Sequence, residues 1–159
     1  MLEMEFDHDS FDVIWSEGAL YYMGFQPALG RCHELLKIGG YLAATEAVYL
    51  VPDPPAPVTQ YFQNAYPDIK DVKGKIRDIR GAGFELVSNF TLSKSTWLNS
   101  YYLPLEGELI RLKKKYEGNQ IAVGVFGELQ RMIDFYREYS RFYSYEFFVM
   151  KKTHPGRNP

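Results

Sequence analysis

A short apolar segment that stops at a carboxylate and a glycine constrains the fold of this chain more than any other stretch. Residues 11–16 read Phe-Asp-Val-Ile-Trp-Ser, and Glu17 and Gly18 follow directly. A run of β-branched and aromatic residues is typical of a parallel strand that is buried on both faces. Open α/β sheets bind ligands just beyond the carboxyl ends of such strands, so Glu17 is the first candidate functional residue. Alternatively, residues 16–18 form only a solvated turn between a strand and a helix.

The residues after this segment predict a right-handed βαβ unit. Pro27 lies near the start of a helix with apolar residues at helical spacing, and Gly39-Gly40 ends that helix. Residues 41–50 then read as a second buried strand, which brings Glu46 to the same edge of the sheet as Glu17. Two carboxylates there could bind a cationic or hydroxyl group, or one could act as a base. The alternative is that Glu46 caps a helix or pairs with a lysine or arginine.

The rest of the chain alternates breakers, helices and strands. The proline-rich stretch 51–57 excludes a regular helix or central strand and predicts a rigid lid. Periodicity predicts helices at 59–66, 71–80, 105–116 and 120–143, strands at 84–92 and 145–151, and a loop at 93–104. Trp97, Tyr101 and Tyr102 lie in that loop, and aromatic side chains in loops beside strand ends are candidates for a ligand pocket. Residues 153–159 read as a disordered tail.

Charge and cysteine content exclude several classes of function. The net charge of −2 gives no electrostatic reason to bind nucleic acid. Cys32 stands alone, so we expect neither a disulfide framework nor a multi-cysteine metal site within the chain. A reducing, cytoplasmic setting is the expectation. No apolar run approaches the length of a membrane span, and no basic segment precedes an apolar one at the start, so neither membrane insertion nor secretion is expected. The thirteen tyrosines and eleven phenylalanines indicate a dense aromatic core or a pocket for a planar apolar ligand.

The stretch Phe-Asp-Val-Ile-Trp-Ser-Glu-Gly-Ala at 11–19 resembles the fourth-strand motif of the class I S-adenosylmethionine (SAM) dependent methyltransferases, in a subfamily that acts on small molecules. Gly39-Gly40-Tyr41-Leu42-Ala43, Thr45-Glu46, Tyr66-Pro67-Asp68-Ile69 and Tyr145-Glu146-Phe147-Phe148 follow in family-like order. The resemblance covers about residues 3–152. It implies an α/β, partial Rossmann-like fold with strands four, five, seven and six in that spatial order, helices on the faces, and strands one to three absent. Residues 1–152 would then be the carboxyl-terminal portion of a methyltransferase domain, and 153–159 its disordered tail.

The resemblance also implies a site. On the cofactor side it points to Trp15, Ser16, Glu17, Gly18 and Tyr21, with Glu17 as the one plausible catalytic base. On the substrate side it points to Glu46, Tyr66, Trp97 and Tyr101. The cofactor would be SAM, the substrate a small molecule, and no metal is implied.

The family's glycine-rich turn and ribose-binding carboxylate are not found in this sequence. Each buried charged or bidentate hydrogen bond is worth roughly 1.5–3 kcal/mol, and three such losses weaken binding by around a thousandfold or more. The sequence therefore predicts an N-terminally truncated methyltransferase whose isolated chain binds SAM weakly or not at all.

Without strands one to three, the strand at 11–16 would present an open apolar edge, which is a template for pairing with another chain. We expect a homodimer, or pairing with a separate chain that supplies the missing half. The alternative function is a non-catalytic, methyltransferase-like interaction module that dimerises through this edge. A third possibility is a carrier that holds an apolar ligand among its aromatic side chains.

Overall fold

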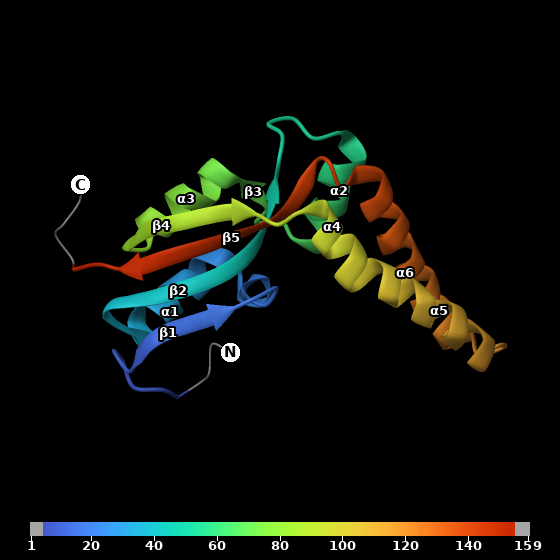
Figure 1. Cartoon of the computed structure of the whole chain (residues 1–159), viewed down its shortest axis with the longest axis horizontal. Helices are drawn as coiled ribbons and strands as arrows, with labels where there is room; N and C mark the ends of the chain where they lie inside the picture. Colours follow the sequence, from blue (N-terminus) through green and yellow to red (C-terminus); the bar gives the residue numbers. More distant parts are fainter. Residues whose placement is uncertain (1–4, 155–159) are drawn as a thin grey trace.

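The computed structural model describes residues 5–154, which form a mixed sheet with helices on one face and a helical arm at one end (Figure 1). The strands are β1 (Phe11–Ser16), β2 (Leu36–Tyr49), β3 (Lys70–Asp71), β4 (Phe84–Thr91) and β5 (Tyr143–Lys152). The helices are α1 (Phe25–Leu35), α2 (Ala56–Ala65), α3 (Val72–Gly81), α4 (Lys94–Trp97), α5 (Leu103–Lys115) and α6 (Gln120–Tyr139). A 3-10 turn, η1 (Leu20–Met23), precedes α1, and a π-helical turn, η2 (Leu98–Tyr102), joins α4 to α5.

The strand order is β1-β2-β5-β4, and β3 pairs with the end of β2. β1 runs parallel to β2, whereas β5 runs antiparallel between β2 and β4. This arrangement confirms the predicted spatial order of strands four, five, seven and six. Ser16 lies opposite Ala44, so the carboxyl end of β1 is level with the middle of the long strand β2.

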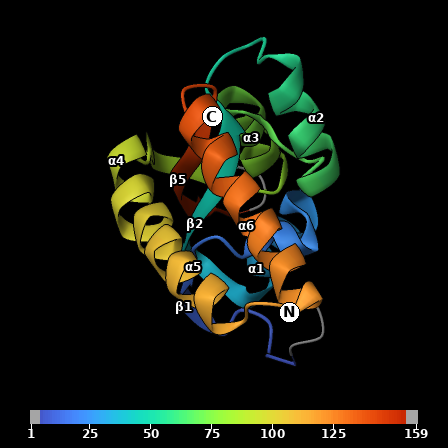
Figure 2. The same cartoon turned by 90° about the vertical axis from the view of Figure 1, so that its right-hand side faces the viewer.

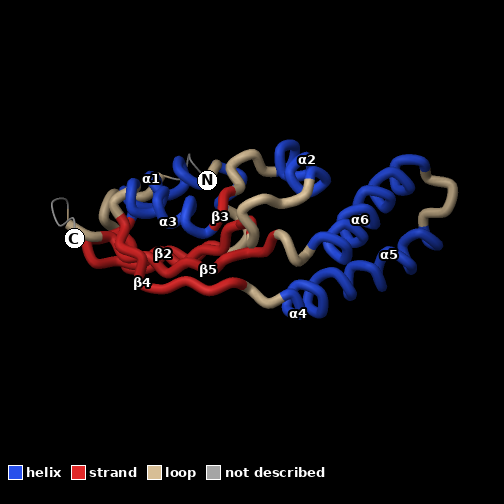
Figure 3. The backbone as a smooth tube through the Cα atoms, turned by 90° about the horizontal axis from the view of Figure 1, so that it is seen from above, coloured by secondary structure: helices blue, strands red, loops and turns tan. Residues whose placement is uncertain are grey.

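Helices α1 and α3 cover one face of the sheet (Figure 3). Apolar residues at helical spacing on α1 meet alternate residues of β2 and β5, because successive strand residues point to opposite faces. The fully buried members of this core include Leu29, Leu36, Leu42, Phe148 and Met150. Burying each such side chain contributes about 1.5–3 kcal/mol, so this layer holds α1 and α3 against the sheet.

Helices α5 and α6 form an arm that projects from one end of the sheet, and Figure 2 shows them side by side. The base of the arm packs through aromatic rings, with the centroids of Tyr102 and Tyr136 4.2 Å apart and those of Phe62 and Tyr143 4.9 Å apart. The α6 periodicity places Ile121 on the apolar face of this helix, yet its side chain is 82% exposed. The first turn of α6 lies at the tip of the arm, beyond the aromatic packing.

The predicted start of the second strand also differs from the structure. Strand β2 begins at Leu36 rather than at residue 41, because Leu36 already pairs with Phe11 ahead of an irregularity in the register. Gly40 permits this close pairing, since a Cβ atom there would lie 3.0 Å from the carbonyl oxygen of Asp12.

The predicted loop at 93–104 is helical. Ser93 caps α4 by accepting a hydrogen bond from the Thr96 N–H at 3.2 Å. Pro104 lies in the first turn of α5, where a missing N–H costs nothing. Trp97, Tyr101 and Tyr102 therefore stand on one helical segment.

The predicted tail at 153–159 falls almost entirely outside the described residues, which end at His154. Within residues 5–154, no helix combines the length and the hydropathy that crossing a membrane requires.

Candidate functional site

The carboxyl end of β1 forms an open turn that is tied to its neighbouring strand. The Gly18 N–H donates to Thr45 Oγ1 at 2.8 Å, which fixes the turn to β2. Gly18 has a φ of +59°, a left-handed conformation that favours glycine, and a Cβ built there would meet no atom within 4 Å. Glu17 is exposed, and its Oε1 accepts a hydrogen bond from Trp15 Nε1 at 2.6 Å. The turn thus presents a carboxylate and an unobstructed stretch of backbone.

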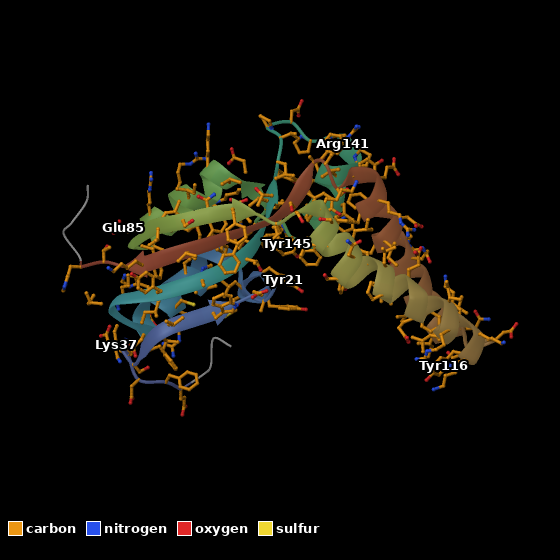
Figure 4. All side chains as sticks on the ribbon, viewed as in Figure 1. Tyr21, Lys37, Glu85, Tyr116, Arg141 and Tyr145 are labelled. Carbon is orange, nitrogen blue, oxygen red and sulfur yellow. The ribbon has the colours of Figure 1, made fainter. Side chains whose placement is uncertain are left out.

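A group of aromatic side chains, called here the tyrosine cluster, lies beside this turn: Tyr21, Tyr22, Tyr101, Tyr145 and Trp97. The Trp97 ring centroid lies 4.7 Å from that of Tyr145 and 5.7 Å from that of Tyr101. Figure 4 shows Tyr21 and Tyr145 together at the inner angle between the sheet and the arm. The cluster therefore joins residues from η1, β5, α4 and η2.

Two members of the tyrosine cluster have raised pKa values. A hydrogen bond to Tyr22, together with burial, raises the pKa of Tyr21 to about 12. Burial and the negative charge of Glu46 raise the pKa of Tyr145 to about 12. Both phenols carry their protons at neutral pH, as an ordinary tyrosine does, and can donate and accept hydrogen bonds there.

A buried triad of Glu46, Tyr66 and Lys75 lies on the helix-covered side of the strand ends. The Lys75 Nζ atom donates to Tyr66 Oη at 2.7 Å and to Glu46 Oε2 at 3.2 Å, and Tyr66 Oη donates to the same carboxylate oxygen. The Glu46 and Lys75 side chains are 1% and 0% exposed. Lys75 Nζ also lies 4.3 Å from the ring centroid of Phe25 and 4.7 Å from that of Tyr66, so aromatic faces contact the ammonium group.

Burial shifts the pKa values of all three side chains of this triad. It raises the pKa of Glu46 above its usual range and lowers the pKa of Lys75, while the attraction between the two charges opposes both shifts. Burial also raises the pKa of Tyr66, and the adjacent carboxylate adds to this effect. The triad joins β2 to α3 and to the segment after α2.

The predicted site residues divide between the two faces of the sheet. Trp15 and Glu17 lie on the face opposite α1 and α3, as do Thr45 and Phe147, which the register pairs. Glu46 points to the covered face, because residues 45 and 46 alternate. The two carboxylates therefore do not share one space, and Glu46 instead pairs with a lysine, as the alternative interpretation had it.

The structure brings Trp15, Glu17 and Gly18 together at the turn, and Tyr21, Trp97 and Tyr101 together in the tyrosine cluster. Ser16 is half-buried at the end of β1, and Glu46 and Tyr66 form part of the buried triad.

Sequence reasoning missed three further residues: Thr45, Lys75 and Tyr145. Lys75 carried a detectable signal, because it lies three residues after Val72 and four before Ile79, on the inward face of the predicted helix. Thr45 and Tyr145 lie in stretches with family-like order, but nothing local assigns them to the site, since contacts between strands remote in sequence give them their positions.

These residues fit one side of a SAM site. Gly18 leaves space for close approach of a ligand, and Glu17 offers an acceptor for hydroxyl or amino groups. Among residues 5–154 no second glycine turn follows a strand and opens a helix, so the part that would hold the methionine group is not among them. Nor do three or more His, Cys, Asp or Glu side chains of this region converge as a metal ion would need.

Comparison with known proteins finds similar solved structures but no matching sequence family. No protein-family model and no curated protein matches the sequence. Among solved structures, the chain is similar to the cyclase SpnF, with a TM-score of 0.71 and 18% identity over 97% of this chain and 54% of SpnF. A SAM-dependent methyltransferase of Geobacter sulfurreducens, bound to S-adenosylhomocysteine, gives a TM-score of 0.72 and 16% identity over 91% of this chain and 59% of that one.

A phosphoethanolamine N-methyltransferase of Haemonchus contortus, in complex with SAM, gives a TM-score of 0.69 and 16% identity over 96% of this chain and 36% of the enzyme. This chain therefore spans only part of the length of the structures that it matches. The presence of a cyclase among them shows that the fold alone does not fix the reaction. The chain has the Rossmann-like fold of the class I SAM-dependent methyltransferases, and it corresponds to the part with strands four, five, seven and six.

Proposed function

We propose that this chain is the carboxyl-terminal part of a SAM-dependent methyltransferase that acts on a small molecule, and that it lacks a glycine-rich turn of its own. One observation carries the proposal: in a sheet with the methyltransferase strand order, β1 ends in an exposed carboxylate and an unobstructed glycine next to the tyrosine cluster.

The turn would hold the cofactor through Trp15, Ser16, Glu17 and Gly18, with Tyr21 beside them. When bound, SAM supplies an electrophilic methyl group. Glu17 is placed to accept a hydrogen bond from a hydroxyl or amino group, and it is the one group at the turn that could take up a proton from the acceptor. Its hydrogen bond from the Trp15 indole fixes the direction of the carboxylate.

The substrate side would be the tyrosine cluster. Trp97, Tyr101 and Tyr145 offer apolar ring faces together with hydroxyl groups, which suits a small molecule with both an apolar body and polar substituents. Glu46 and Tyr66 act one layer deeper, because their contacts with Lys75 hold the strand end in place. Orientation of the acceptor by such walls supplies much of the rate enhancement in a displacement reaction.

Calorimetric titration with S-adenosylhomocysteine tests the cofactor role. We expect weak binding by the isolated chain, and a further loss of about ten- to a hundredfold in a Glu17→Ala variant, because a hydrogen bond to a charged group is worth about 1.5–3 kcal/mol. Glu85→Ala is the matched control, since Glu85 is an exposed glutamate at the far end of the sheet (Figure 4).

Equal affinity in the wild-type and Glu17→Ala proteins would contradict the proposal. Apolar ligands that bind the wild-type and Glu17→Ala proteins with equal affinity would instead indicate a carrier function. Saturation-transfer NMR extends the measurement to millimolar dissociation constants, where an incomplete site is expected to lie.

A further inference from the structure

The tyrosine cluster presents aromatic rings to solvent beside the turn that follows β1. Tyr22 is 77% exposed and Tyr101 is 44% exposed, while Tyr21, Trp97 and Tyr145 are half-buried. The planes of the Tyr101 and Trp97 rings make an angle of 83°, whereas the Tyr145 ring lies at 31° to Trp97. Two rings at nearly a right angle can contact one small group from two sides. The cluster therefore has the geometry of a corner lined by aromatic rings.

The charges around the tyrosine cluster are negative, and none of its five members is a lysine, arginine or histidine. The charged group that most raises the pKa of Tyr145 is the Glu46 carboxylate, and the other groups with this effect are tyrosines. Lys75 pairs with Glu46 and offsets much of its charge. Glu17 is an exposed carboxylate at the neighbouring turn and carries a negative charge that no described cation pairs with. These surroundings favour a positively charged ligand over an anionic one.

Elsewhere in the chain, the protein's own cations lie over aromatic rings. Lys115 Nζ lies 5.2 Å from the ring centroid of Tyr116, and the Arg141 guanidinium lies 4.6 Å from that of Phe142. Among residues 5–154, no ring of the tyrosine cluster has a lysine or arginine placed in this way. The rings of the cluster can therefore accept a cation from a ligand.

We propose that the tyrosine cluster binds the ammonium group of an alkylamine through the rings of Tyr101, Trp97 and Tyr145. The inference rests on the proposed function in taking this amine as the methyl acceptor, and it narrows the small molecule to a cationic one. A ring attracts a cation over its face through the negative centre of its π system, and the attraction grows as water leaves the contact. An amine that binds as its ammonium ion gives up one proton before it can react as a nucleophile. Glu17 is the carboxylate at the turn that can take up this proton.

Titration of the wild-type chain with choline, followed by proton NMR of the ligand, tests the preference for a cation. Choline is a suitable probe because its quaternary ammonium group keeps its charge at every pH. Dimethylbutanol, which has carbon in place of the nitrogen, is the uncharged probe of the same shape. We expect the methyl resonance of choline to shift upfield, because the ring current shields protons over a ring face. We also expect choline to bind at least about tenfold more tightly than dimethylbutanol.

Variants of Tyr101 separate its ring from its hydroxyl group. Tyr101→Leu should weaken choline binding about three- to tenfold, because one ring is lost. Tyr101→Phe keeps the ring, so it should lose no more than about twofold. Tyr116→Leu is the matched control, since Tyr116 is 41% exposed and lies at the far end of the arm (Figure 4). It should bind choline as the wild type does. Far-UV circular dichroism checks that each variant is folded, and the comparison of the two probes needs no variant.

Three results would overturn the proposal. The first is the same affinity for choline and dimethylbutanol, or no detectable binding of choline at tens of millimolar. The second is a Tyr101→Phe variant that loses as much affinity as Tyr101→Leu, which would assign the contact to the hydroxyl group. The third is a Tyr101→Leu variant that loses affinity for SAM but not for choline, which would assign the rings to the sulfonium group of the cofactor.

The choline titration contains no cofactor, so it can fail independently of the proposed function. If Glu17→Ala loses affinity for S-adenosylhomocysteine while the chain shows no preference for choline, the ammonium site is refuted and the proposed function stands. If the chain prefers choline while its affinity for S-adenosylhomocysteine ignores Glu17→Ala, the proposed function is refuted and the ammonium site stands.

Discussion

Replacement of Lys75 by methionine tests whether the buried triad stabilises the fold. Methionine keeps the length of the side chain, so the change removes the ammonium group without opening a cavity. Glu46 then stays in the interior with only the Tyr66 hydroxyl as its partner. Removal of one member of a buried ion pair costs about 3–5 kcal/mol, a large part of the ~5–15 kcal/mol by which most domains are stable.

Urea unfolding followed by far-UV circular dichroism measures this loss. With a slope of about 2 kcal/mol per molar urea, a loss of 3–5 kcal/mol lowers the midpoint by about 1.5–2.5 M. The double variant Lys75→Met/Glu46→Gln should recover at least about 2 kcal/mol, because no uncompensated charge remains in the interior and the glutamine carbonyl still accepts from Tyr66. Lys37→Met is the control: its pair with Asp12 is exposed, and such pairs contribute ~0–1 kcal/mol.

The difference between the variant and the wild type should also depend on pH. Burial raises the pKa of Glu46 in the folded state, and loss of Lys75 removes the attraction that opposes this shift. A raised folded-state pKa makes the unfolding free energy fall as pH rises through the window above the unfolded value. The penalty in Lys75→Met is thus greatest near pH 7 and shrinks as Glu46 takes up a proton toward pH 4.5. A loss below about 1 kcal/mol at pH 7, or a loss independent of pH, would refute the reasoning.

Three further predictions concern the turn and the core. Gly18→Ala should destabilise the fold by about 1–2 kcal/mol, because the φ angle of Gly18 is +59°. Gly30→Ala should stabilise the fold by about 0.5–1 kcal/mol, because Gly30 lies in the middle of α1 with open space around it. Urea unfolding of both variants measures these changes, and equal shifts of the two midpoints would contradict the prediction. Thr45→Val should cost about 1 kcal/mol and weaken S-adenosylhomocysteine binding, since the Gly18 N–H loses its acceptor, while Thr45→Ser should retain both; unchanged calorimetric affinity in Thr45→Val would separate the turn from the ligand site. Burial raises the pKa of Cys32 to about 11, so Ellman's reagent should modify this thiol at pH 8 only as fast as the protein unfolds locally. A rapid reaction in the absence of urea would contradict the burial of Cys32 on α1.

Much of the site could be predicted because its signals are local. The segment at 11–18 combines an apolar run with a carboxylate and a glycine, which predicts the end of a buried parallel strand. The structure confirms the parallel strand and places the open turn at its end, but no residue of β1 is buried, so the prediction of a strand covered on both faces is wrong for the described residues. The tyrosine cluster was predicted in part: Tyr21, Trp97 and Tyr101 were named, but as members of a loop and a turn with no stated contact. Tyr145 joins them through the antiparallel pairing of β5 with β2; the resemblance implied this strand order, but no local pattern around Tyr145 shows which side chains it meets.

The sequence by itself determined the elements and their order, because hydrophobic periodicity, prolines and glycines act over a few residues. Tertiary structure decided what each element touches. Lys75 lies on the inward face of α3, yet only the packing of α3 against β2 shows that it pairs with Glu46. Trp15 lies in a segment whose apolar composition is typical of a buried strand, yet its side chain is exposed because no described element lies over it. Burial and charge pairing depend on residues that are far away in the chain. The free energy of burying a side chain is therefore set by the groups packed around it rather than by the residue itself.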